Sequence, residues 1–154
     1  MAIRAENYEI ENAEIGFRNF AGAEGPYNAA GERSFAVFLT PEDERVLTEK
    51  GWNVKHTKAT DDDGNAKGYL PVSVVYKNYP PKIVLITSRA KTVIDEEVVE
   101  MLDWADIRNV DLVLRPYNWT VNGNSGIKAY IKSMYVVLEE DAFEAKYADI
   151  PEGR

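Results

Sequence analysis

The sequence of 154 residues contains no cysteine and a single histidine, His56. The absence of cysteine excludes a disulfide framework, a thiolate zinc site and a cysteine nucleophile, and it fits a reducing compartment. One histidine excludes the usual multi-histidine metal sites. No apolar run approaches the roughly 20 residues that a membrane-spanning helix needs, and residues 1–4 do not begin an apolar signal segment. We therefore expect a cytoplasmic protein with no cofactor, no metal and no membrane partner.

The chain also lacks a net positive charge. Its formal net charge is −8, which argues against a simple basic nucleic-acid binder. Half of that charge lies in the segment from Glu139 to the end, so the preceding residues can still carry a local basic face. The acidic end has two interpretations: a solubilising tail, or a tail that shields a cationic groove or docks other proteins.

The composition is that of one folded domain, with 45% hydrophobic and 29% charged residues. We predict a domain over residues 1–139 and an acidic tail over residues 140–154. Predicted strands cover residues 13–20, 33–39, 52–55, 69–77, 82–87, 110–120 and 127–139. Helices are predicted from Thr40-Pro41 to residue 49 or 50 and over residues 92–105, and a polar loop runs through Gly68. Strands and helices do not alternate regularly, which favours a mostly β barrel or sandwich over a parallel α/β sheet.

The last two predicted strands are joined by Asn122-Gly123-Asn124-Ser125-Gly126, a good hairpin signature. Residues two apart on a strand share a face. A hairpin loop of even length therefore places two sets of side chains on one face: Arg115, Tyr117 and Trp119 with Lys128, Tyr130 and Lys132. A four-residue loop pairs Trp119 with Lys128, whereas a two-residue Asn-Gly loop shifts the pairing by two and keeps the faces. The opposite face is the predicted core: Leu112, Leu114, Ile127, Ala129 and Ile131.

A strip of three aromatic rings and three cations is suited to single-stranded nucleic acid. Rings stack on bases of any identity, and lysine and arginine follow the phosphates. The same spacing also fits another interpretation, in which the rings cover a second small core. Other candidates for the strip lie near strand ends or turns: Arg18, Phe20, Tyr27, Arg33 and Lys55. Trp52 is expected in the core.

No catalytic constellation is found, and we expect a protein that is not an enzyme. The run Asp61-Asp62-Asp63-Gly64 fails the spacing of a calcium loop, because glycine falls at the fourth position and no glutamate at the twelfth. The sequence contains neither a phosphate-binding glycine-lysine loop nor a serine nucleophile elbow.

Several segments resemble a group of bacteriophage-encoded single-stranded DNA-binding proteins. The most specific is Arg115-Pro116-Tyr117-Asn118-Trp119, followed by Asn122-Gly123 and Gly126-Ile127-Lys128-Ala129-Tyr130. The other segments are Phe17-Arg18-Asn19-Phe20, Tyr27-Asn28, Gly51-Trp52-Asn53-Val54-Lys55 and Ile107-Arg108-Asn109-Val110. The resemblance covers most of residues 10–148. It implies an oligonucleotide-binding (OB) β-barrel that coats single strands during phage replication and recombination.

The leading hypothesis is therefore a sequence-independent binder of single-stranded DNA. One departure from single-strand binders of bacteria is the tail, which ends Ile150-Pro151-Glu152-Gly153-Arg154 without their apolar anchor. Recruitment of replication or recombination proteins through the tail is therefore left open, as is a homodimer. The alternative is a phage structural or host-protein-interacting β-domain, including an inhibitor whose acidic surface mimics DNA. Binding to oligo-dT separates these hypotheses.

Overall fold

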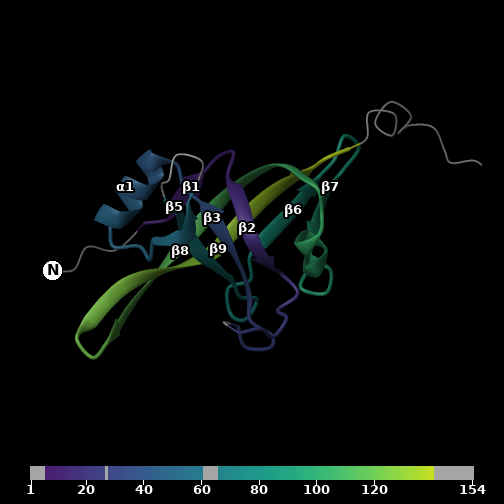
Figure 1. Cartoon of the computed structure of the whole chain (residues 1–154). Coiled ribbons are helices and arrows are strands. Elements are labelled where there is room, and N and C mark those ends of the chain that lie inside the picture. Colours follow the sequence, from purple (N-terminus) through teal and green to yellow (C-terminus); the bar gives the residue numbers. More distant parts are fainter. Residues whose placement is uncertain (1–5, 27, 61–65, 141–154) are drawn as a thin grey trace, which may run out of the picture.

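The computed structural model describes residues 6–26, 28–60 and 66–140 (Figure 1). The elements in chain order are β1 (Tyr8–Ile10), β2 (Glu14–Asn19), β3 (Arg33–Phe38), α1 (Pro41–Glu49), β4 (Lys55–Thr60), β5 (Ala66–Val74), β6 (Lys82–Ile86), β7 (Lys91–Ile94), the 3-10 helix η1 (Val99–Asp103), β8 (Ile107–Val121) and β9 (Asn124–Leu138). The predicted acidic tail lies outside the described residues from position 141 onward. Among the described residues, no helix has the length and apolar character to cross a membrane.

The main sheet has the strand order β1-β8-β9-β5-β3-β2. Its two end strands, β1 and β2, are consecutive in the chain, and Ala13 N between them donates to Val110 O of β8 at 2.8 Å. Strand β5 pairs with β9 in parallel, and the other pairs along this path are antiparallel. The result is a mostly β domain, as the strand pattern predicts, with an open sheet of OB-like topology, as the family resemblance implies.

Strands β8 and β9 form a long antiparallel ribbon. Figure 1 shows this ribbon running the length of the molecule, with its connecting turn projecting at one end. Beyond β5, the strand β6 pairs in parallel with the second half of β9, and β7 completes a hairpin with β6. The middle of the ribbon therefore lies within the main sheet, one end of β9 carries the added strands β6 and β7, and the other end projects as a hairpin.

Helix α1 begins where the sequence predicts. The Thr40 side chain accepts a hydrogen bond from Asp43 N at 3.2 Å, and Pro41 occupies the first turn, where its missing N–H costs nothing. The helix ends at Glu49 and buries Leu47 completely. Gly51 follows with a φ of +88°, a left-handed conformation that glycine adopts without strain.

The core is built from the predicted inward faces of the ribbon. The predicted residues Leu112, Leu114, Ile127, Ala129 and Ile131 are all buried, together with Val110, Met134 and Val136. Trp52 is 5% exposed and packs at 6.3 Å from the Tyr8 ring, so its assignment to the core is confirmed. Alternation along β8 and β9 was sufficient to assign the five ribbon side chains, because successive residues of a strand point to opposite faces of the sheet.

The predicted helix over residues 92–105 is wrong. Val93 and Ile94 belong to β7, where they lie opposite Val84 and Ile83 of β6. Only Val99–Asp103 is helical, as a short 3-10 turn that buries Val99 and Leu102. Pairing with β6 overrides the local helical pattern, because a strand neighbour is a tertiary feature that local periodicity does not encode.

The predicted loop through Gly68 is also partly wrong. Residues 55–60 form β4, in which Lys55 lies opposite Tyr69 and His56 opposite Gly68 of β5. His56 is exposed, as expected, and its ring contacts the Glu44 carboxylate. The exposed Lys55 and His56 need no buried face, because β4 lies off the main strand order and pairs with β5.

Candidate nucleic-acid interface

The turn between β8 and β9 is a two-residue Asn-Gly turn. Asn122 and Gly123 have φ values of +51° and +82°, and Val121 pairs with Asn124. Two left-handed residues match the type I′ turn, whose twist suits a right-handed ribbon. The four-residue register is therefore wrong and the two-residue alternative is right.

Replacing Gly123 by alanine should lower the free energy of unfolding by about 1–2 kcal/mol, because a Cβ disfavours the left-handed conformation. Gly25 is the matched control, since its φ is not left-handed and a Cβ at either glycine would meet no atom within 4 Å. Urea denaturation of both variants measures the difference. Equal stability of Gly123→Ala and Gly25→Ala would contradict the turn geometry.

The observed register brings Tyr117 opposite Lys128 and Arg115 opposite Tyr130, all on the outward face. The Tyr117 and Tyr130 rings meet edge to face, with centroids 5.8 Å apart and an interplanar angle of 89°. Lys128 Nζ lies 5.3 Å from the Tyr130 ring centroid. Tyr117 is 52% exposed, so these rings do not seal a second core.

A fifth residue, Tyr79, joins this group from the loop between β5 and β6. Arg115 Cζ lies 5.2 Å from the Tyr79 ring centroid and 5.3 Å from that of Tyr130, so the guanidinium contacts both rings. Tyr79 is 71% exposed, and Asn78 before it has a φ of +71°. We define Tyr79, Arg115, Tyr117, Lys128 and Tyr130 as the ribbon cluster.

Tyr79 is the member that sequence reasoning missed. Its segment, Asn78-Tyr79-Pro80-Pro81, lies between the predicted strands over residues 69–77 and 82–87. The available signal was an aromatic residue beside a turn-forming asparagine and two prolines, which fix the loop backbone. Its contact with Arg115 requires β5 and β6 both to lie beside β9, which the sequence does not specify.

Trp119 lies farther along the ribbon, opposite Gly126. A Cβ at Gly126 would lie 2.9 Å from Cζ2 of Trp119, so the indole rests on the glycine backbone. The indole is half-buried by this contact. Such cross-strand packing of an aromatic ring on glycine fixes the ring orientation near the ribbon tip.

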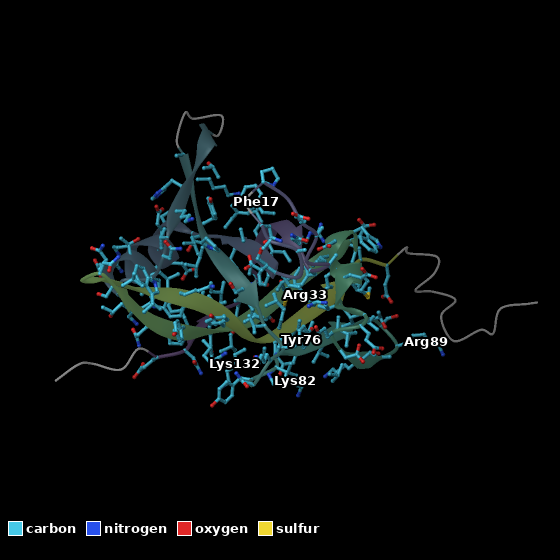
Figure 2. All side chains as sticks on the ribbon, turned by 90° about the horizontal axis from the view of Figure 1, so that it is seen from below. Phe17, Arg33, Tyr76, Lys82, Arg89 and Lys132 are labelled. Atoms are coloured by element: carbon cyan, nitrogen blue, oxygen red, sulfur yellow. The ribbon has the colours of Figure 1, made fainter. Side chains whose placement is uncertain are left out.

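Lys132 has no partner on β8. The ribbon pairing shifts between Val113 and Leu114, which face Ser133 and Ile131, so Lys132 is the extra residue of a bulge. Its side chain is exposed, and Lys82 of β6 pairs with the adjacent Ser133. Figure 2 shows Lys132 and Lys82 at the same edge of the molecule.

The prediction that Phe20 belongs to the exposed strip is corrected. Phe20 is fully buried and stacks on Phe35, with centroids 5.1 Å apart and an interplanar angle of 20°. The pairing of β2 with β3 shifts between Gly16 and Asn19, which breaks the alternation along β2. As a result Phe17 points outward and Phe20 inward.

Two other predicted cations are engaged elsewhere. Arg18 donates to Leu102 O and Ala105 O, both at 2.9 Å, and lines a pocket of about 620 Å³ between β2 and β8. Arg33 forms an ion pair with Glu96 at 3.1 Å and lies 5.9 Å from the Tyr76 ring centroid. Both side chains serve contacts that stabilise the fold, and the structure does not bring them to the ribbon cluster.

The last two predicted residues are Tyr27 and Lys55. Tyr27 lies outside the described residues. Lys55 is exposed on β4, opposite Tyr69 and away from the ribbon cluster.

The ribbon cations are free of ion pairs within the described part of the chain. The ion pairs found there involve Arg33, Arg45, His56 and Lys67, but not Arg115, Lys128 or Lys132. No group of three acidic, histidine or cysteine side chains suited to a metal ion occurs among these same residues. The chemistry that the surface offers is stacking on exposed rings beside unneutralised cations.

An OB-like domain with an exposed aromatic and cationic surface belongs to a class that includes binders of single-stranded nucleic acid. The chain belongs to the family described as "Putative phage ssDNA-binding domain", whose model matches residues 1–154. The family resemblance predicted from the sequence motifs is thereby confirmed. No curated protein sequence matches the chain.

Two solved structures of the single-stranded DNA-binding protein from bacteriophage Enc34 are similar in fold. One aligns with a TM-score of 0.56 and 10% identity, covering 96% of this chain and 86% of that one. The other, in complex with ssDNA, aligns with the same TM-score and identity and covers 89% of each chain. At this identity the likeness shows the fold.

Proposed function

We propose that this chain binds single-stranded DNA independently of base sequence, without enzymatic activity, during phage replication or recombination in the host cytoplasm. The observation that carries the proposal is the guanidinium of Arg115 in contact with the exposed ring of Tyr79 and the half-buried ring of Tyr130. Family membership and the fold of the Enc34 protein support it.

The binding mechanism combines base stacking on aromatic rings with neutralisation of phosphates by cations. Bases stack on Tyr117, Tyr130 and Tyr79, each contributing about 1–3 kcal/mol irrespective of base identity. Arg115 and Lys128 lie beside the Tyr130 ring, and Lys132 follows Tyr130 by two residues on β9. These three cations neutralise phosphates. Because every base has a flat face and every nucleotide has a phosphate, neither the stacking nor the phosphate contacts depend on base sequence.

A titration with fluorescein-labelled oligo-dT, followed by anisotropy, tests the proposal. Single-stranded DNA should bind in preference to a duplex of the same length, because paired bases cannot reach the rings. Absence of binding to oligo-dT at low salt would remove the proposed function and favour the alternative of a protein-binding β-domain.

Affinity should fall with salt in a defined way. If Arg115, Lys128 and Lys132 each neutralise one phosphate, the slope of log K against log salt concentration is about −2, from roughly −0.7 for each phosphate of a single strand. Lys128→Gln should reduce the magnitude of the slope by about 0.7. Anisotropy titrations at several salt concentrations measure both values, and a slope near zero would exclude phosphate contacts by these residues.

A further inference from the structure

We propose that the outward face of β2, β3 and β5 carries a second base-stacking subsite, so that one DNA strand contacts two aromatic clusters. The inference rests on the proposed function and extends it to residues that the sequence analysis did not assign. The second site consists of Phe17, Phe38 and Tyr69, which we define as the phenylalanine cluster.

The three rings contact one another in edge-to-face geometry. The Phe17 centroid lies 5.6 Å from that of Phe38 and 5.4 Å from that of Tyr69, and the Phe38 and Tyr69 centroids are 6.3 Å apart. Phe17 is 63% exposed, although burial in the core would remove more of its apolar surface from water. An exposed aromatic ring supported by two others is a platform on which a further flat ring can stack.

The backbone holds Phe17 in this position at a cost. Its φ of +47° lies in the left-handed region, which a bulky residue seldom adopts. The strain falls at the bulge between Gly16 and Asn19, which turns the side chain outward. Strain of this kind persists where the surrounding structure imposes it and is concentrated at functional sites.

Gly16 completes the platform. A Cβ at this position would lie 2.5 Å from Cε2 of Phe38, so only glycine allows the Phe38 ring to lie against the backbone of β2. The ring is thereby held in one orientation beneath Phe17. A preorganised ring loses little conformational entropy when a base stacks on it.

Two lysines give the phenylalanine cluster the same chemistry as the ribbon cluster. Lys67 Nζ lies 4.4 Å from the Phe38 ring centroid, and Lys55 lies directly opposite Tyr69 on the neighbouring strand. Lys67 is also 3.0 Å from the Glu14 carboxylate, which partly neutralises it in the free protein. Cations beside flat rings are the combination that single-stranded DNA requires.

Strand β5 connects the two clusters. Tyr69 belongs to the phenylalanine cluster, and Ser73, four residues along the same outward face, pairs with Tyr130 of the ribbon cluster. Strand geometry places the clusters roughly 14 Å apart along this route. Figure 2 shows Phe17 and Lys132 on opposite sides of the molecule, so a DNA strand that contacts both the phenylalanine cluster and Lys132 would bend around β5.

The variant Phe17→Asn tests the second subsite, because asparagine tolerates the left-handed backbone but has no ring. With oligo-dT of about 12 nucleotides, within the usual range for one OB fold, Phe17→Asn should weaken binding about 5- to 100-fold. With oligo-dT of about 4 nucleotides, which spans one cluster, the loss should be several-fold smaller. Trp104→Ala is the matched control: Trp104 is 69% exposed at the end of η1, and its loss should leave both affinities unchanged.

Phe17→Trp provides a second readout. It retains a ring at the site, so affinity for the longer oligonucleotide should stay within about two-fold of wild type. DNA should also quench more tryptophan fluorescence in Phe17→Trp than in the wild type, whose three tryptophans give the background. The second subsite would be overturned, and the ribbon cluster left standing, if Phe17→Asn bound the longer DNA as tightly as wild type. The same holds if DNA quenched no more fluorescence in Phe17→Trp than in wild type. Failure of the wild-type protein to bind either oligonucleotide would overturn the proposed function itself.

Discussion

The double variant Tyr117→Ala, Tyr130→Ala, which lacks both tyrosine rings of the ribbon, should bind oligo-dT about 100-fold or more weakly than wild type. The two rings contact each other, and Tyr130 also contacts Arg115 and Lys128. Each lost stacking interaction costs about 1–3 kcal/mol, and about 1.4 kcal/mol corresponds to a factor of ten. Anisotropy titration with labelled oligo-dT, oligo-dA and a mixed sequence measures the loss, which should be similar for all three.

Two controls separate stacking from structural damage. Phenylalanine at both positions keeps the rings and should retain affinity within a few-fold, because stacking needs no hydroxyl group. The alanine variant should keep the wild-type unfolding midpoint to within a few degrees, since Tyr117 is exposed and Tyr130 only half-buried. Wild-type affinity in the alanine variant would exclude the ribbon cluster from the binding surface.

Phe20→Ala should lower the free energy of unfolding by about 3–5 kcal/mol, the usual cost of deleting a buried phenylalanine ring. Phe20 is fully buried against Phe35, so the substitution leaves a cavity in the core. For a domain whose total stability is about 5–15 kcal/mol, this loss is a large fraction. Urea denaturation followed by circular dichroism measures it.

Phe17→Ala is the matched comparison, because the same residue type lies three positions away and is 63% exposed. Its effect on stability should stay within about 1 kcal/mol. The milder Phe20→Leu keeps the comparison measurable if Phe20→Ala does not fold. A larger loss for Phe17→Ala than for the Phe20 variants would contradict the inversion of the two side chains at the β2 bulge.

Features that depend only on residues close together in the sequence were predicted correctly. The start of α1 was predictable because Thr40, Pro41 and Asp43 form its cap within one turn. The two faces of the ribbon were predictable because side chains alternate along each strand, and an even-length turn joins them. The register itself needed the turn conformation, which two residues with positive φ decide.

Other features depended on neighbours distant in sequence. Residues 91–94 became a strand because β6 lies beside them, and Phe20 turned inward because the bulge in β2 interrupts the alternation. Tyr79 entered the ribbon cluster only because β5 and β6 flank β9 in parallel. None of these contacts leaves a signature in a window of a few residues.

By itself, the sequence determined the class of fold, the buried and exposed faces of β8 and β9, and a set of rings and cations typical of single-strand binding. Side-chain alternation and turn chemistry act over a few residues, so these features can be deduced from the chain alone. The tertiary structure decided which rings meet which cations, because pairing between distant strands and the placement of bulges are properties of the whole sheet. The contact of Tyr79 with Arg115 and the outward position of Phe17 both arise at that level.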